Sequence, residues 1–279
     1  MLPLFIIIIF TLLPISSHGQ NVSRFNDCAT KLYSCGDTIR SIGYPFWGED
    51  RPDYCGLPQF SLTCRDDGVT TVRIIDTTFR LLTINQTTSR FTIAPDYIWR
   101  GPDVCSLRTH QIITNNSFEQ TVFAYIPERF MCVGLHLSCV ENEDNPIPTP
   151  IPSRNRLNCV GDEGGGRVSF FRNGSMTLGQ ESCESEIVVP VLKNQFDEFM
   201  ENETTPLTEL LKRGFPIVYK VEGLGICSRC EGSGGTCWSN YTYSASYCLC
   251  PDGISRLGVC HGSSGSSILY STFINNRFR

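Results

Sequence analysis

Ile42-Gly-Tyr-Pro-Phe-Trp-Gly48 is the stretch that decides the fold, because it is short, aromatic and enclosed by cysteines. Cys28 and Cys35-Gly36 precede it, and Arg51-Pro-Asp-Tyr-Cys-Gly56 and Phe60-Ser-Leu-Thr-Cys64 follow it. The rest of the chain is also rich in cysteine, with 15 among 279 residues. A reduced cytosolic enzyme normally carries far fewer, so the count indicates an oxidising compartment and a fold held by disulfides.

The overall composition excludes two broad classes of protein. Hydrophobic residues make up 41% of the chain, which is enough for a packed core and excludes wholesale disorder. The chain carries 23 Lys and Arg against 28 Asp and Glu, a net charge of −5. Because affinity for phosphates comes mainly from basic residues, this balance argues against a nucleic-acid-binding protein.

The N-terminal residues indicate the compartment. Residues 1–15 are apolar apart from Thr11, and this run is shorter than the ~20 residues of a membrane-spanning helix. With small Ser17 and Gly19 at the −3 and −1 positions, they predict a signal peptide over 1–19, cleaved before Gln20. A short membrane anchor is the alternative. Six Asn-x-Ser/Thr sites for glycosylation follow, at Asn21, Asn85, Asn115, Asn173, Asn202 and Asn240. Together these features predict an extracellular glycoprotein.

A proline-rich segment offers the best domain boundary. Residues 141–156 hold prolines at alternate positions from Pro146 to Pro152, which favours a stiff polyproline II spacer. We therefore predict one domain over 20–140, a linker over 141–156 and a Cys-rich module over 157–262, followed by a flexible polar tail over 263–279. A long loop inside one domain is the alternative for 141–156. After residue 15, no stretch approaches ~18 consecutive apolar residues, so no later membrane span is expected.

Short β-type runs dominate the chain. Val72, Ile74, Leu82 and Ile84 show the partial alternation of half-buried strands. We expect strands within 59–64, 69–75, 79–84, 90–94, 121–126 and 134–139, and after the linker within 167–171 and 186–192. The spacing predicts an antiparallel, all-β first domain.

Helices are expected only after the linker. Thr205 as N-cap, Pro206 at the first helical position, leucines at 207, 210 and 211 and a terminating Gly214 predict a short helix. Residues 191–203 predict a weaker second helix. The expected fold class is mainly β and disulfide-rich, with two small Cys-rich modules, the second containing one or two short helices.

Six cysteines crowd the C-terminal part, at Cys227, Cys230, Cys237, Cys248, Cys250 and Cys260. Zinc binding is the alternative to disulfides, but thiols that pass through an oxidising compartment should form three bridges, whose pairing the spacing leaves open. The other cysteines are Cys28, Cys35, Cys55, Cys64, Cys105, Cys132, Cys139, Cys159 and Cys183. The total is odd, so one thiol lacks an intrachain partner.

The first half resembles the galacturonan-binding domain of plant wall-associated receptor kinases. The resemblance rests on the Cys-Gly, Tyr-Pro-Phe-Trp-Gly, Cys-Gly and Leu-Thr-Cys elements quoted above, with Phe79-Arg-Leu-Leu-Thr-Ile84 and Pro102-Asp-Val-Cys105 further on. Cys132 has no clear counterpart in the family pattern and is our candidate for the unpaired thiol, either inert or linking two chains.

The second half resembles the C-terminal module of the same kinases. The matching residues are Cys183 with Val188-Val-Pro-Val191, Arg213-Gly-Phe215, Cys227-Ser-Arg-Cys-Glu-Gly-Ser-Gly-Gly-Thr-Cys237 and Cys248-Leu-Cys-Pro-Asp-Gly253. The combination is most similar to ectodomains of leaf-rust-resistance-type receptor-like kinases. Two residues depart from the family pattern, with Tyr219 at a usual Trp and Trp238 at a common Gly. The Gly-rich loop, His-Arg-Asp and Asp-Phe-Gly motifs of kinases are absent from the sequence.

The resemblance implies that the ligand is pectin, an acidic galacturonan. Arginine forks match carboxylates and aromatic faces match sugar rings, so the candidate ligand-binding residues are Arg40, Tyr44, Phe46, Trp47, Arg51 and Tyr54. Further arginines recur along the expected strands at Arg73, Arg80, Arg90, Arg100 and Arg108. The alternative is that Phe46 and Trp47 belong to the core and that the arginines are solvated.

Calcium and catalysis are the weaker interpretations. Glu49, Asp50 and Asp53 form an acidic cluster without the spacing of a calcium loop, so no metal is expected. No Gly-x-Ser-x-Gly motif is present, and His110, His136 and His261 lie far apart, so neither an enzyme nor a cofactor is expected.

We therefore expect a secreted, cell-wall (apoplastic) protein that binds pectin, with a membrane co-receptor as a second candidate partner and family relatives anchored in the plasma membrane. One alternative is a protein- or peptide-binding ectodomain; another is a fragment of a longer receptor-like Ser/Thr kinase.

Overall fold

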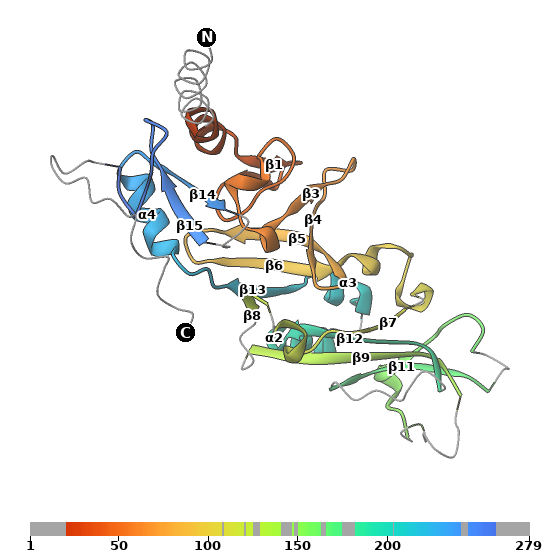
Figure 1. The fold of residues 1–279 in the computed structure, drawn as a ribbon. Coiled ribbons are helices and arrows are strands. Elements are labelled where there is room, and N and C mark those ends of the chain that lie inside the picture. Colours follow the sequence, from red (N-terminus) through yellow and green to blue (C-terminus); the bar gives the residue numbers. More distant parts are fainter. Residues whose placement is uncertain are drawn as a thin grey trace, which may run out of the picture.

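The computed structural model describes residues 21–107, 109–119, 121–124, 129–140, 147, 150–162, 166–174, 182–202, 204–240 and 245–260. The expected signal peptide, the polar tail, half of the proline-rich segment and Arg108 lie outside these residues, as do the side chains of Asn115, Asn240 and His110. The described residues form two large sheets, two small sheets and several short helices, which confirms a mainly β, disulfide-rich fold (Figure 1).

The larger sheet has the order β3-β4-β5-β6-β13-β8, with every neighbouring pair antiparallel. Its strands are β3 (Leu62–Cys64), β4 (Thr70–Ile74), β5 (Thr77–Asn85), β6 (Arg90–Pro95), β13 (Phe215–Tyr219) and β8 (Phe123–Ala124). The expected strands at 69–75, 79–84 and 90–94 are thereby confirmed. In place of a strand over the whole of 59–64, a 3-10 turn over Pro58–Phe60 precedes β3; Pro58 stands at its first position, where the fixed φ of proline suits a helical turn.

The second sheet has the order β10-β11-β9-β12-β7. Its strands are β7 (His110–Ile112), β9 (Phe130–Cys139), β10 (Arg156–Leu157), β11 (Val168–Asn173) and β12 (Cys183–Leu192). Only β7 and β12 run parallel; the other neighbours are antiparallel. β12 is apolar from Ile187 to Leu192 and is buried along most of its length, as expected of a strand covered on both faces.

Both large sheets combine strands from either side of the proline-rich segment. β13 follows that segment in the chain yet pairs with β6, and β9 precedes it yet pairs with β11 and β12. A single core cluster contains Leu62 and Phe91 from one sheet together with Leu135 and Ile187 from the other. The two predicted modules therefore share both sheets and one core, and residues 140–155 connect β9 to β10 of one sheet.

Two small sheets and the helices complete the described fold. The small sheets contain β1 (Tyr33–Cys35), β2 (Ile39–Ile42), β14 (Thr236–Asn240), β15 (Ala245–Leu249) and β16 (Ser255–Arg256). The helices are α2 (Lys193–Glu201), α3 (Leu207–Lys212) and α4 (Leu224–Gly232), and residues 21–30 are also helical. Further 3-10 turns are Asp53–Cys55, Asp96–Trp99, Val104–Ser106, Asn115–Phe118 and Ser153–Asn155. None of these helices is both long and apolar enough to cross a membrane.

The two helices expected near 191–203 and after Pro206 correspond to α2 and α3. The structure differs at the helix start, since the N-cap of α3 is Pro206 and not Thr205, and no side chain caps it.

Fourteen cysteines form seven disulfides. The bridges are Cys28–Cys55, Cys35–Cys64, Cys105–Cys159, Cys139–Cys183, Cys227–Cys237, Cys230–Cys248 and Cys250–Cys260. Cys132, the cysteine without a family counterpart, is the unpaired one and is half-buried. Burial raises the pKa of its thiol, which makes it a poor nucleophile in the folded state.

A thiol count tests this pairing. Unfolding in guanidinium without reductant should expose one maleimide-reactive thiol in each wild-type chain and none in Cys132→Ser, whereas the folded protein should react slowly because the thiol is half-buried and protonated. Electrophoresis and peptide mass mapping supply the measurement. Two or more reactive thiols would contradict the pairing, and no reactive thiol would show that Cys132 links two chains.

A buried polar group lies in the second sheet. The His136 side chain is fully buried on β9, its Nδ1 lies 3.2 Å from a carboxylate oxygen of Glu186 on β12, and its ring stacks on Phe170 at 4.8 Å. Burial and the positive charge of Arg172 lower the pKa of His136 below its ordinary value of 6.5, although Glu186 opposes this shift. Neutral His136 is therefore part of the folded state.

His136 should make stability depend on pH. Below pH 6.5 the unfolded chain takes up a proton at this position that the folded chain does not, so stability is lost as pH falls, by up to about 1.4 kcal/mol per pH unit from this group. His136→Gln should flatten the change in free energy of unfolding between pH 7 and pH 5, measured by guanidinium denaturation. Comparing slopes removes any constant destabilisation by the substitution, and parallel wild-type and variant curves would contradict the prediction.

Candidate functional site

Phe46, at the centre of the aromatic motif, belongs to the core. Its side chain is fully buried, and its ring centroid lies 5.1 Å from Phe60, 5.3 Å from Tyr219 and 6.0 Å from Phe91. These rings meet mostly edge to face, an arrangement that aromatic pairs favour. Tyr219, which departs from the family pattern, is thus a central contact of this cluster. The structure removes Phe46 from the candidate ligand-binding surface.

Arg51 is also buried, with an exposed fraction of 2%. Its Nε–H donates to the carbonyl oxygen of Phe46 at 2.9 Å, and its Nη2 donates to that of Cys55 at 2.8 Å. Nη1 donates to the carbonyl oxygens of Cys28 and Lys31 at 2.9 and 2.7 Å. Burial lowers the pKa of Arg51 to about 10, so it remains charged at neutral pH. Its fork binds the protein's own backbone and cannot receive a sugar carboxylate.

Tyr44 and Trp47 connect the motif to neighbouring segments. Tyr44 is buried, and its hydroxyl shares a hydrogen bond of 2.5 Å with the hydroxyl of Ser246 on β15. Trp47 is half-buried, and its Nε1–H donates to the carbonyl oxygen of Leu57 at 2.7 Å. Tyr44 thus joins the first half of the chain to the C-terminal hairpin, and Trp47 is only partly accessible.

Arg40 and Tyr54 lie nearer the surface. Arg40 has a side chain 62% exposed that pairs with Asp37 at 2.6 Å. The hydroxyl of half-buried Tyr54 donates to a carboxylate oxygen of Asp27 at 2.6 Å; burial and this carboxylate raise the pKa of Tyr54 to about 12. The guanidinium of Arg24 lies 5.5 Å from the Tyr54 ring centroid and 5.7 Å from that of Trp238. The six candidate residues are therefore not brought together into one accessible group.

The strand arginines divide into paired and unpaired ones. Arg80 pairs with Asp96 at 2.8 Å and lies 4.3 Å over the Trp99 ring, and Arg73 lies 3.6 Å from Asp76. Arg90, at the start of β6, is exposed and forms no ion pair with a described residue. It lines a cleft.

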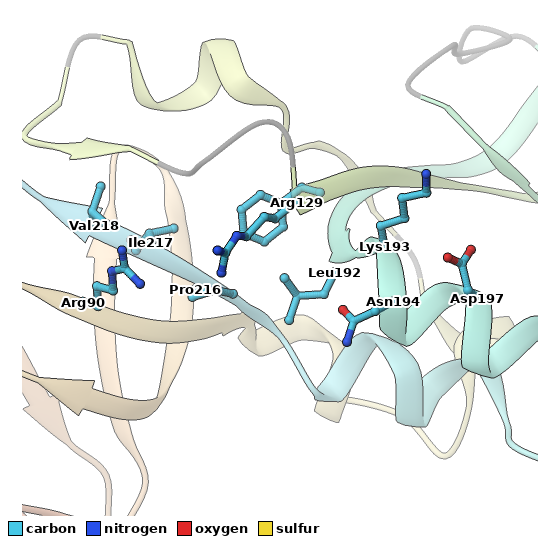
Figure 2. A pocket seen from close by; sticks show the side chains of 10 residues that line it. Arg90, Arg129, Leu192, Lys193, Asn194, Asp197, Pro216, Ile217 and Val218 are labelled. Atoms are coloured by element: carbon cyan, nitrogen blue, oxygen red, sulfur yellow. The ribbon is translucent and has the colours of Figure 1, made fainter. Parts of the chain in front are cut away.

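This cleft, of about 540 Å³, lies where the two large sheets meet (Figure 2). We call it the β13–α2 cleft; its lining residues are Arg90, Arg129, Phe130, Leu192, Lys193, Asn194, Asp197, Pro216, Ile217 and Val218. Each sheet contributes a cross-strand pair: Arg90 lies opposite Val218, and Phe130 lies opposite Leu192. Residues directly opposite in an antiparallel pair share one face, so both pairs present their side chains together.

The charges in the β13–α2 cleft favour an anion. Arg90, Arg129 and Lys193 are cationic, and only Asp197 is a carboxylate. Figure 2 shows Arg90 and Arg129 toward one end of the cleft and Lys193 and Asp197 toward the other. Sequence reasoning missed Arg129 and Lys193. The available signal was their position, since each directly adjoins the end of a long apolar strand, β9 and β12.

A second, larger cavity of about 820 Å³ lies beside the edge strand β8. Its charged lining residues are Glu119, Lys220 and Glu222, so carboxylates outnumber cations. An acidic ligand therefore suits the β13–α2 cleft better than this cavity.

Two groups of potential metal ligands occur in the described part of the chain. They are Cys230, Cys248 and Cys260, and His136, Cys183 and Glu186. All four sulfur atoms take part in disulfides, so neither group offers a thiolate.

Two of the acidic residues near Arg51 bind the backbone. Glu49 accepts a hydrogen bond from the N–H of Cys64 at 2.9 Å, and Asp53 accepts one from the N–H of Tyr54 at 2.7 Å.

Each half of the chain matches a known protein family. Residues 28–95 match the family described as wall-associated receptor kinase galacturonan-binding, and residues 158–253 match the family described as wall-associated receptor kinase C-terminal. Both regions are of the wall-associated receptor kinase type. The expected resemblance is thereby confirmed, and neither matched region is a kinase catalytic domain.

Similar curated proteins come from Arabidopsis thaliana. The chain is 26% identical to leaf rust 10 disease-resistance locus receptor-like protein kinase-like 2.8 over 80% of its own length and 24% of that protein. It is 25% identical to the like 1.3 protein, covering 84% of this chain and 30% of the relative, and 27% identical to the like 1.2 protein, covering 85% and 34%. The chain thus spans about a quarter to a third of the length of these relatives. No solved structure matches it.

Paired substitutions separate a structural arginine from a surface one. Arg51→Ala should lower the free energy of unfolding by about 3 kcal/mol or more, because it leaves four buried carbonyl hydrogen bonds unmade. Arg40→Ala should change it by less than about 0.5 kcal/mol, since its only described ion pair is exposed. Guanidinium denaturation gives both values, and an Arg51→Ala protein as stable as Arg40→Ala would refute this assignment.

Proposed function

We propose that this chain is an extracellular polysaccharide-binding protein whose ligand is pectic galacturonan. The observation that carries the proposal is the match of residues 28–95 to a galacturonan-binding family. Seven disulfides support an extracellular location, because such bridges persist in oxidising compartments. The predicted signal peptide and glycosylation sites belong to the same proposal.

Binding would occur without covalent chemistry. Galacturonan repeats a carboxylate on every sugar ring, and guanidinium groups bind carboxylates through paired, charge-assisted hydrogen bonds. Sugar rings also present apolar C–H faces that pack on apolar side chains. Each contact is weak, but a repeating polymer engages several chains or sites at once and so gains avidity. Such a protein would bind the wall polymer reversibly. The proposal concerns binding alone and does not extend to the activity of the much longer receptor-like relatives.

A protein or peptide ligand is the second candidate. The cavity beside β8 favours it, because β8 pairs only with β13 among the described strands and so offers an open sheet edge next to a cavity of mixed charge. Exposed strand edges can accept an additional strand from a partner.

Titration with defined saccharides tests the polysaccharide proposal. The chain secreted from a glycosylating host should bind de-esterified oligogalacturonides, and binding should weaken between low salt and ~0.15 M salt because exposed charge pairs are screened. Fully methyl-esterified oligogalacturonides and a neutral glucan should bind at least tenfold more weakly in isothermal calorimetry.

The control for folding is a cooperative unfolding transition of the same preparation. If the folded protein does not bind de-esterified oligogalacturonides, the proposed function is overturned and a protein ligand becomes the leading candidate. Equal affinity for the ester and the free acid would show that carboxylates are not what is recognised.

A further inference from the structure

We infer that the β13–α2 cleft is the site where this protein holds a uronate segment, with Arg90, Arg129 and Lys193 as its carboxylate-binding groups. The inference rests on the proposed function and deepens it, because it assigns the ligand to residues outside the aromatic motif. Most of these residues also lie outside the 28–95 region that the galacturonan-binding family covers.

The floor of the cleft suits the apolar face of a sugar ring. Pro216 and Val218 alternate along β13 with the buried Phe215, Ile217 and Tyr219, and so their side chains point away from that core. Phe130 and Leu192 continue the apolar surface from the other sheet, and both are half-buried. Partly exposed apolar side chains on a strand pair make a rigid, shallow surface, because the backbone beneath them is held by sheet hydrogen bonds.

The cations of the cleft are available to a ligand. Arg90, Arg129 and Lys193 are exposed, and none forms an ion pair with a described residue. By contrast, Arg80 on β5 and Arg65 just after β3 share the carboxylate of Asp96 as a partner. Three cations that lack an ion-pair partner among the described residues, beside one carboxylate, contrast with the net charge of −5 of the whole chain. They create local attraction for an anion against the overall field of the protein.

The arrangement fits a carboxylated saccharide better than a compact anion. The cations lie toward both ends of the cleft: Figure 2 shows Pro216, Ile217 and Val218 beside Arg90 and Arg129, and Leu192 between these arginines and Lys193. A single phosphate would meet only one end and would gain nothing from the apolar floor. A uronate segment places its carboxylates at intervals and its ring faces between them. The volume of about 540 Å³ falls within the range of ligand sites, which is roughly 300–1,000 Å³.

Asp197 allows a test of whether the charge of the ligand is negative. It is the only carboxylate that lines the cleft, and it is exposed on the first turns of α2. A carboxylate facing a polyanion opposes binding, so its removal should strengthen affinity. A gain of affinity is informative because damage to the fold cannot produce it.

The experiment titrates de-esterified oligogalacturonides into the wild-type chain and four variants at low salt. Arg90→Ala combined with Arg129→Ala should weaken affinity at least tenfold, and Lys193→Ala should weaken it about threefold. Asp197→Asn should tighten it about threefold. Arg229→Ala is the matched control, because it removes an exposed arginine of α4 that does not line the cleft, and it should leave affinity unchanged. Thermal unfolding of each variant checks that the fold is retained.

The outcomes separate this site from the proposed function. Weaker affinity in the arginine and lysine variants, together with tighter affinity in Asp197→Asn, supports the assignment of the cleft. Wild-type binding that none of these variants changes overturns the site and leaves galacturonan binding standing. Absence of wild-type binding overturns both proposals. A parallel titration with an oligoglutamate peptide provides the remaining contrast, since equal, cleft-dependent affinity for that peptide would show a general acidic-peptide site and refute the saccharide.

Discussion

The pairing of β13 with β6 is the contact on which the rest of the structure depends. It places a strand from the C-terminal half between β6 and β8 of the first half, so the larger sheet cannot form from the first half alone. One face of β13 carries Tyr219 into the aromatic cluster around Phe46, while Pro216 and Val218 form the floor of the β13–α2 cleft. The core and the candidate site are therefore two sides of one strand.

Arg51 imposes a second constraint, close to the aromatic motif. Its guanidinium gathers carbonyl oxygens from Cys28, Lys31, Phe46 and Cys55, so it holds three separate backbone segments around one charge. A cation is well suited to this role because backbone carbonyls carry partial negative charge and need donors when buried. The Cys28–Cys55 disulfide lies at the same place, which makes this the most heavily cross-linked part of the first half.

Local patterns predicted local structure well. Alternation identified β4 and β5, a short β-type run identified β6, and Pro206, the leucine face and Gly214 located α3 to within a residue. Sequence reasoning missed β13 because Phe215–Tyr219 is only five residues long, and missed α4 because Leu224–Gly232 begins and ends among glycines and cysteines. The sequence could not predict which distant strands pair, because alternation shows which face of a strand is buried and not which strand lies beside it.

The candidate site illustrates the same limit. Arg51 and Arg90 are the same residue type and both follow short polar stretches, and only folding reveals that one binds carbonyls and the other faces a cleft. Arg129 and Lys193 join Arg90 only through the meeting of two sheets. The family resemblance correctly drew attention to arginine chemistry, but the motif that carries the resemblance contributes mainly to the core.

The Cys105–Cys159 bridge has a consequence for how this chain would respond to proteases. It connects residues on either side of the proline-rich segment, and Cys139–Cys183 does the same from β9 to β12. A single cut between residues 140 and 158 would therefore leave two fragments joined by two covalent links and by the shared sheets. In an environment that contains proteases, the two fragments of such a cleaved chain would stay together, and both sheets that line the cleft would remain in place.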